Sequence, residues 1–106
     1  MNKYHKALRE YPFVKVYPTT YNGRIDIEEK AGRIALRSAF HRNRDDSEMA
    51  LRITAAYFGK DVLYERCFRR DTESEPSESG KGTYKYSVWQ ATGVAAKRRL
   101  RQQTGS

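Results

Sequence analysis

The stretch that decides the fold runs from Asn22 to Gly59 and reads NGRIDIEEKAGRIALRSAFHRNRDDSEMALRITAAYFG. Its first half predicts two short strands, and its second half predicts a capped amphipathic helix. The stretch contains no catalytic signature. The sequence therefore supports a broad functional class and not a named activity.

Asn22-Gly23 is the strongest short-range signal for a β-hairpin, because a type I′ turn needs positive φ at both of its central residues. Residues 13–17 before the turn and residues 24–29 after it both alternate with the strand period. Pro18 places the first strand at an edge of the sheet or at a bend. The apolar positions that this pattern buries are Val14, Val16, Ile25 and Ile27.

Residues 27–42 fit either a helix or a strand, and Gly32 decides narrowly between them. Inside a helix this glycine costs about 1 kcal/mol relative to alanine. Residues 30–32 instead fit a three-residue hairpin loop with glycine in the left-handed position. We therefore expect a strand from Arg33, which completes a three-stranded antiparallel meander. Its inward side chains are Ile34, Leu36 and Phe40, and its outward ones are Arg33, Arg37 and His41.

Residues 46–58 carry clear helix signals. Asp45 or Asp46 can cap the N-terminus, and Asp45 stands three residues before Glu48 as in a capping box. Gly59 is a suitable C-terminal residue. The apolar stripe expected to face the sheet consists of Met49, Ala50, Ile53, Ala56 and Tyr57.

The flanking segments complete an α+β domain. Residues 2–10 fit a short helix, and residues 62–70 and 83–92 alternate as the strands of a second hairpin. The acidic, Ser- and Gly-rich residues 71–82 between those strands predict a mobile loop. We expect residues 1–93 to form one α+β domain, a small antiparallel sheet packed on one main helix. Residues 94–106 then form a basic C-terminal segment with helix-forming residues, so that short helices lie at both termini.

The chain is strongly basic. Its 106 residues include 21 Lys and Arg against 13 Asp and Glu, a net charge of +8. Residues 71–80 hold four acids and no Lys or Arg, which leaves 21 basic and 9 acidic residues, or +12, elsewhere. Such a surface attracts polyanions, and nucleic acid is the commonest one. An anionic membrane or an acidic protein would satisfy the same charge.

Several functional classes lack any signal. Cys67 is the only cysteine, and it lies far in sequence from His5 and His41, so no metal-ligand spacing exists. We expect no metal and no cofactor. The first residues are polar and no apolar run approaches a membrane span, which predicts a cytoplasmic protein without a membrane partner.

The outward face of the predicted meander collects cations and aromatic rings. A basic sheet face can read bases in a major groove or support single strands by stacking. The alternative is an ordinary solvated sheet face, on which Asp26 and Glu28 would repel phosphate. The candidate nucleic-acid-binding residues on this face are Lys15, Tyr17, Tyr21, Arg24, Arg33, Arg37 and His41. The basic tail adds Lys97, Arg98, Arg99 and Arg101, and its alternative is a solvated terminus.

Residues 13–60 resemble the DNA-binding domains of plant ethylene-response factors and the arm-binding domains of phage integrases. The resemblance lies in residues 32–36 (GRIAL), 48–52 (EMALR) and 55–59 (AAYFG), which are similar to a last strand, an acidic helix start and an Ala/Tyr-rich helix end. It implies a three-stranded sheet that reads DNA through Arg24, Arg33 and Arg37. The second hairpin has no counterpart in those families.

Three functions compete. We expect a non-enzymatic nucleic-acid-binding accessory protein of a phage or mobile element, with DNA favoured over RNA. The alternative is an inhibitor or adaptor of anti-defence type that binds a host protein or nucleoprotein complex, since Tyr and Trp enrich interfaces. The third is a small basic ribonuclease toxin that would use His41 with Arg42 and Arg44, or His5 with Tyr4. The sequence leaves the oligomeric state open.

Overall fold

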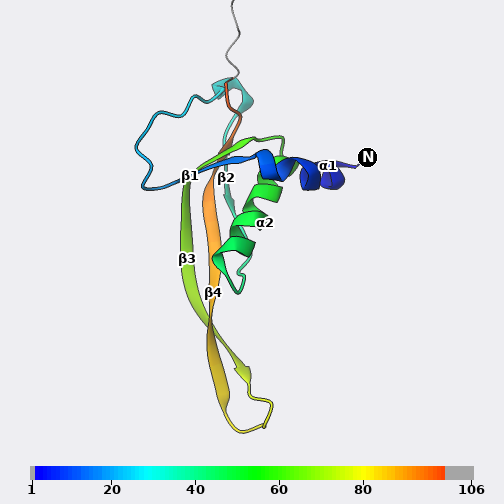
Figure 1. Cartoon of the computed structure of the whole chain (residues 1–106), viewed down its shortest axis with the longest axis vertical. Coiled ribbons are helices and arrows are strands. Elements are labelled where there is room, and N and C mark those ends of the chain that lie inside the picture. Colours follow the sequence, from blue (N-terminus) through cyan, green and yellow to red (C-terminus); the bar gives the residue numbers. More distant parts are fainter. Residues whose placement is uncertain (1, 100–106) are drawn as a thin grey trace, which may run out of the picture.

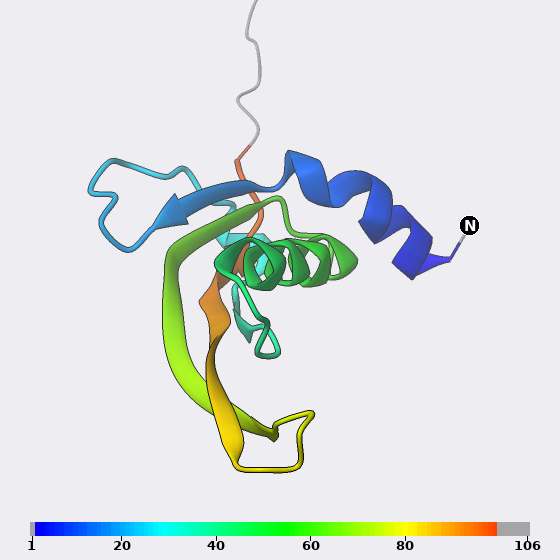
Figure 2. The ribbon, with the colours of Figure 1, turned by 60° about the horizontal axis from the view of Figure 1, so that its bottom comes forward.

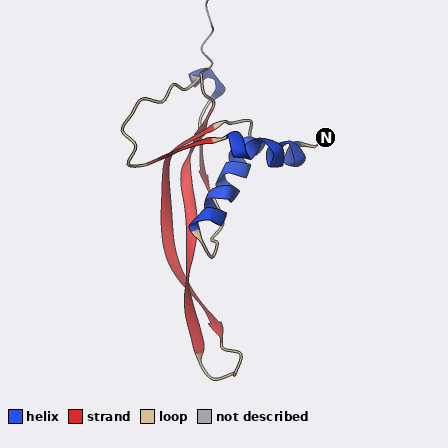
Figure 3. Ribbon diagram, viewed as in Figure 1, coloured by secondary structure: helices blue, strands red, loops and turns tan. Residues whose placement is uncertain are grey.

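The computed structural model describes residues 2–99, in which two helices lie on one side of a four-stranded mixed sheet (Figures 1 and 3). The α+β class is therefore confirmed. The helices and strands are α1 (Lys3–Glu10), the 3-10 turn η1 (Tyr11–Phe13), β1 (Lys15–Pro18), the 3-10 turn η2 (Glu29–Ala31), β2 (Ile34–Arg37), α2 (Arg44–Tyr57), β3 (Val62–Pro76) and β4 (Thr83–Ala96). None of the described helices is long and apolar enough to cross a membrane.

The strand order is β1-β3-β4-β2, with β1 parallel to β3 and the other neighbours antiparallel. The predicted meander is wrong, because β1 and β2 lie at opposite edges and residues 24–29 form only an isolated bridge, Ile27 with Arg98. β1 pairs instead with the start of β3, where Val62 and Leu63 are fully buried. The alternating charges of residues 24–29 offer β1 a far less apolar partner.

The connection from β1 to β2 is not a tight hairpin. Gly23 lacks the positive φ that a type I′ turn requires. The ring of Tyr21 folds back over it, so a Cβ at Gly23 would lie 2.3 Å from the Tyr21 hydroxyl oxygen. The predicted β2 strand is confirmed, and Gly32 has the expected positive φ of 79°. Its turn is the 3-10 segment η2, which a side chain of Glu28 caps.

Helix α2 begins at Arg44, two residues earlier than predicted. Its cap is Asn43, whose side-chain oxygen accepts a hydrogen bond of 2.7 Å from the backbone N–H of Asp46. Neither Asp45 nor Asp46 is the cap. At the other end the N–H groups of Gly59 and Lys60 bond to carbonyls of the last turn, as predicted for a glycine terminator.

The buried face of α2 is rotated relative to the predicted stripe. Leu51, Ala55 and Ala56 are buried, whereas Met49 and Tyr57 remain 41% and 39% exposed. The predicted stripe merged the residues that face the sheet with those that face α1. The hydroxyl of Tyr11 lies 3.5 Å from the sulfur of Met49, and the Lys3 ammonium lies over the ring of Tyr57. Those two contacts involve the N-terminal segment and not the sheet.

Small residues let α2 approach the sheet closely. Leu51 and Ala55 pack on Ala91 and Ala95 of β4 and on neighbouring Leu63, all with no exposed surface. Gly93 stands between those two alanines. A Cβ there would lie 3.2 Å from a backbone oxygen of the neighbouring strand and 3.6 Å from a methyl group of Leu51. The core is therefore shallow and closely packed.

The β3–β4 hairpin continues beyond the part of the sheet that α2 covers (Figures 1 and 2). Residues 71–76 belong to β3, so the predicted loop over 71–82 shortens to a turn at 77–82. Cross-strand partners pair regularly down to Pro76 and Thr83. We call residues 71–87 the arm and the remaining described residues the body. Residues 94–96 extend β4, so the predicted terminal helix does not start at Val94.

A bulge in β3 marks the bend between its first residues and the arm. The register with β4 shifts between Tyr64 and Cys67, and Glu65 has a φ of 54°. An extra residue in one strand bends it and increases its twist. β1 also ends here, where the N–H of Thr19 bonds to the carbonyl of Arg66. Figure 2 shows β3 curving away from β1 toward the arm.

Candidate nucleic-acid interface

The side of the sheet opposite α2 carries neither α1 nor α2, the two α-helices among the described residues, and we call it the open face. Alternation along each strand shows which residues lie on it. Leu63, Ala91 and Ala95 pack on α2, and Leu36 is packed against the same core. By this alternation the open-face residues of β3, β4 and β2 in the body are Val62, Tyr64, Cys67, Arg69, Val88, Gln90, Thr92, Val94, Ala96, Ala35 and Arg37, of which Val62, Val88 and Ala96 are buried.

The open face brings together five of the seven predicted sheet residues. Lys15 and Tyr17 alternate with Val16, which packs on the core, and Arg33 alternates with Ile34. The ring of Tyr21 packs on Tyr17 with a centroid distance of 4.6 Å. The predicted residues that share this side are Lys15, Tyr17, Tyr21, Arg33 and Arg37. The topology that gathers them differs from the predicted one, because β3 and β4 separate the two edge strands.

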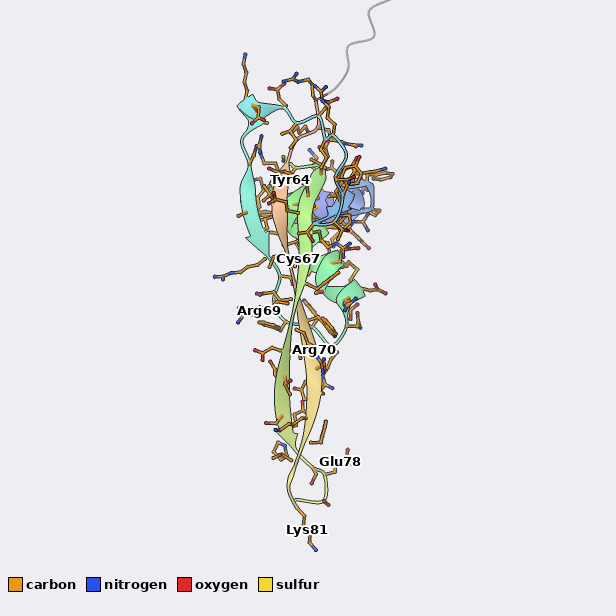
Figure 4. All side chains as sticks on the ribbon, turned by 90° about the vertical axis from the view of Figure 1, so that its left-hand side faces the viewer. Tyr64, Cys67, Arg69, Arg70, Glu78 and Lys81 are labelled. Atoms are coloured by element: carbon orange, nitrogen blue, oxygen red, sulfur yellow. The ribbon has the colours of Figure 1, made fainter. Side chains whose placement is uncertain are left out.

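Arg69 is an open-face cation that the predicted site lacked, and Tyr64 lies on the same face of the same strand. Figure 4 shows Tyr64, Cys67 and Arg69 following one another along β3. Simple alternation over residues 62–70 puts Tyr64 and Arg69 on opposite sides. The bulge at Glu65 reverses the alternation, so that both point away from α2. A positive φ at a glutamate has no sequence signal.

Arg33 is held in place by two partners. Its guanidinium pairs with the carboxylate of Glu29 and donates a hydrogen bond of 2.9 Å to the hydroxyl of Tyr64. The hydrogen bonds to Glu29 and then to Tyr64 raise the pKa of Arg33. Arg37 and Arg69 differ, because neither forms an ion pair within residues 2–99. These exposed guanidiniums are the cations most available to a phosphate.

Two predicted residues lie elsewhere. Arg24 sits in the connection before η2, where its Nε lies 3.1 Å from Asp26. His41 exchanges two backbone hydrogen bonds with Trp89, of 2.8 and 2.6 Å. Directly paired residues share a face, and Trp89 alternates with the buried Ala91, so His41 belongs to the helix side. The prediction failed because strand β2 ends at Arg37, four residues before His41.

The C-terminal cations form a separate group at the end of β4 opposite the arm. Lys97, Arg98 and Arg99 are exposed, and Arg101 lies outside the described residues. The backbone N–H of Arg98 donates to Asp61 at 2.7 Å, and its Nε lies 3.6 Å from the same carboxylate. Lys97, Arg98 and Lys60 border an open cavity of about 330 Å³ beneath α1.

The arm reverses the charge of the open face. Residues 71–87 carry four acids and two lysines, a net −2. Tyr84 and Tyr86 donate hydrogen bonds of 2.5 and 3.1 Å to Glu75, and Arg42 binds the same carboxylate at 3.1 Å. The hydrogen bonds from Tyr84 and then Tyr86 lower the pKa of Glu75. Burial and hydrogen bonds to carboxylates raise the pKa of Tyr86, over which Arg42 stacks at 3.5 Å.

Arginines and aromatic rings alternate on the helix side of the sheet. The guanidinium of Arg44, in the first turn of α2, lies 4.3 Å from the ring of Trp89 and 5.5 Å from that of Phe68. Arg66 lies 4.6 Å from Phe68 and pairs with Glu48 of α2 at 3.2 Å. These contacts fasten the start of α2 to the sheet.

The residues that a ribonuclease reading requires lie in two places. Arg42 stacks on Tyr86, Arg44 stacks on Trp89, and His41 follows the edge of β4. His5 and Tyr4 belong to α1, where their ring centroids lie 6.3 Å apart. Within residues 2–99 no group of three or more His, Cys, Asp or Glu could hold a metal ion.

No protein-family model, no curated protein and no solved structure matches this chain. The resemblance of residues 13–60 to ethylene-response factors and integrase arm-binding domains therefore stays a prediction. The antiparallel meander that the resemblance implied is not formed.

Proposed function

We propose that this protein is a non-enzymatic nucleic-acid-binding accessory protein of a phage or mobile element. Its contact surface is the open face of the body. The observation that carries the proposal is the gathering of Lys15, Arg37 and Arg69 on the side of the sheet opposite α2, which neither α1 nor α2 covers. The rings of Tyr17, Tyr21 and Tyr64 lie on the same side and offer stacking surfaces.

Phosphate contacts explain this surface better than base contacts do. Arg37 and Arg69 are exposed, form no ion pair among the described residues, and lie on β2 and β3, the two strands that flank β4. A cation that binds a phosphate releases condensed counterions, which makes affinity fall with salt. Arg33, already bound to Glu29 and Tyr64, is a positioned cation whose planar group can contact a base edge.

The first test is fluorescence anisotropy with labelled DNA and RNA of mixed sequence at low and moderate salt. Binding at low salt that weakens as salt rises supports the proposal, and we expect tighter binding to DNA than to RNA. Absence of binding to both nucleic acids at low salt overturns it.

Variants locate the surface. Arg37→Ala and Arg69→Ala should each weaken binding to all sequences and flatten the slope of log K against log salt by about 0.7–0.9. Arg9→Ala is the matched control, because Arg9 is exposed on α1 and away from the sheet. An equal loss in all three variants would show attraction by net charge alone and would reject the open face as the site.

A protein-binding role is the second candidate, and the acidic arm favours it. Glu73 and Glu75 with Tyr84 and Tyr86 form a polar and aromatic surface outside the basic body. An inhibitor or adaptor that acts through this surface would capture a host protein that stays bound in high salt and after nuclease treatment. Loss of every partner on nuclease treatment would favour nucleic acid instead.

A further inference from the structure

The outer edge of β3 is unpaired along the arm. β1 pairs with β3 only at its start, through Lys15, Val16 and Pro18. The bond from Thr19 to the carbonyl of Arg66 is the last on that edge. From Cys67 to Pro76, β3 has a neighbour on one side only among the described residues, which is β4. A row of free N–H and C=O groups on a long strand is a template for another strand.

Charges along this edge are segregated and not mixed. Arg69 and Arg70 are the last residues of β3 in the body, and Asp71, Glu73 and Glu75 follow in the arm. Like charges directly opposite each other destabilise a strand pair. A parallel, in-register copy of the edge would place each charge beside its like. An antiparallel copy places the basic end of each strand beside the acidic end of the other.

We propose that two copies of this chain pair antiparallel along the free edge of β3, within residues 67–75. Among residues 2–99, the two central charges that such a pair would use have no other side-chain partner. Arg69 forms no ion pair there, and Asp71 accepts only the neighbouring backbone N–H of Thr72, at 2.8 Å. The free edge of β3 thus carries both halves of a self-complementary pair.

Symmetry limits the register. Two antiparallel strands that lie side by side in one sheet are related by a twofold axis perpendicular to it, and the interface is self-complementary. Each residue then opposes one from the same face. Arg69 therefore opposes Asp71 or Glu73 of the second copy, and symmetry makes that pair twice. The two favourable pairs stand against one like-charge contact on the axis, which is Arg70 with its own copy in the first register and Asp71 with its own copy in the second. Both open faces point to the same side of the joined sheet, which doubles the number of cations presented there.

Cys67 provides the measurement. It is the only cysteine, is exposed, and begins the free edge (Figure 4). A nitroxide on Cys67 permits distance measurement by double electron–electron resonance in the full chain, without nucleic acid. If Arg69 opposes Asp71, the two Cys67 Cα atoms lie about 20 Å apart, and if it opposes Glu73, about 27 Å, at ~3.4 Å per residue.

Sedimentation velocity should show a dimer whose population rises with concentration, with one of these two distances in the labelled sample. A monomer throughout the soluble concentration range overturns the proposal. A dimer with a label distance outside this range assigns the contact to another surface and also overturns it. Both measurements are made without nucleic acid, so their failure leaves the proposed function intact.

Charge exchange tests the pairing itself. Arg69→Glu should weaken dimerisation on the order of tenfold or more, because each repulsive pair occurs twice. Arg9→Glu makes the same charge change on α1 and should leave the dimer unchanged. Exchanging Arg69 with the acid that the label distance places opposite it should restore the dimer. An unchanged dimer in Arg69→Glu would reject the charge pairing.

Discussion

The body and the arm use the same two strands and are held together in different ways. In the body, α2 covers β3 and β4, and Leu51 and Leu63 are fully buried between helix and sheet. Among residues 2–99 no helix or further strand covers the arm, whose contact with the body includes Arg42 on Tyr86 and Glu75, and residues 71–74 and 83–85 are exposed. Body stability therefore rests on burial, and arm order rests on cross-strand pairs such as Tyr84 with Glu75.

This difference predicts two levels of local stability. An isolated two-stranded hairpin is at best marginally stable in water. Regions with few buried apolar contacts open more readily than the core. Changes in the body should alter global unfolding, and changes in the arm should alter local order alone.

The largest effect is expected from Leu51→Ala. Leu51 has no exposed surface, and one of its methyl groups lies against Gly93 of β4. Its replacement by alanine therefore leaves a cavity that the surrounding shallow core cannot fill. We expect a loss of about 2–5 kcal/mol in the free energy of unfolding, measured by urea denaturation. Met49→Ala is the control: Met49 belongs to the same helix but is 41% exposed, so its loss should cost much less free energy of unfolding. Equal costs would contradict the observed orientation of α2.

A smaller loss is expected from Asn43→Ala, which removes the N-cap bond to Asp46. The cost should be about 0.5–2 kcal/mol in thermal or urea unfolding. Asn22→Ala changes the same residue type in the connection that does not form a type I′ turn, and it should cost less. If Asn22→Ala were the more damaging, the predicted Asn-Gly hairpin would regain support.

The arm should respond to acid before the body does. The pKa of Glu75 is lowered by Tyr84 and Tyr86, so its pairing stabilises the arm above the ordinary glutamate pKa of about 4.3 and is lost as pH falls through the lowered value. The ring signals of Tyr84 and Tyr86 in NMR spectra should therefore shift as the pH falls below about 4.3. The methyl signals of Leu51 should not move in that range.

Glu75→Gln is the control for this acid transition, because an amide cannot titrate. Its spectra should lack the step in the tyrosine signals. A step that persists would assign the transition to another carboxyl group of the arm, such as Glu73, which accepts a hydrogen bond from Tyr86.

The smallest effect is expected from Thr72→Ala in the middle of the arm. Thr72 is exposed and opposes Ser87, so the global free energy of unfolding should change by no more than about 0.5 kcal/mol. A larger loss in urea denaturation would mean that the arm and the body unfold as one unit.

Local patterns in the sequence predicted most of the elements and little of their pairing. The strands at 13–17, 62–70 and 83–92 and the helix at 46–58 have counterparts, and the strand predicted from Arg33 through His41 has a shorter one that ends at Arg37. The parallel pairing of β1 with the start of β3 was not predicted, because the two segments are distant in sequence. The alternation within a strand does not indicate which other strand it pairs with. The acidic residues 71–76 looked disordered by composition, but cross-strand Tyr–Glu bonds order them.

The candidate site was predicted in part for a similar reason. Alternation within one strand placed Lys15, Tyr17 and Arg37 correctly relative to the core. Arg69 was missed because its orientation depends on the bulge at Glu65. His41 was misplaced because strand β2 is shorter than its apolar pattern suggests.

The bulge at Glu65 also makes the geometry of the arm independent of that of the body. Beyond it, β3 contacts a regular antiparallel partner alone, so the ribbon is a repeating ladder of residue pairs. Inserting two residues into each strand would carry the turn about 7 Å outward while every side chain kept its face. Inserting one residue into each strand would move the acidic side chains to the opposite face of the hairpin. The length of the arm can thus be changed in steps of two residues per strand without disturbing the body.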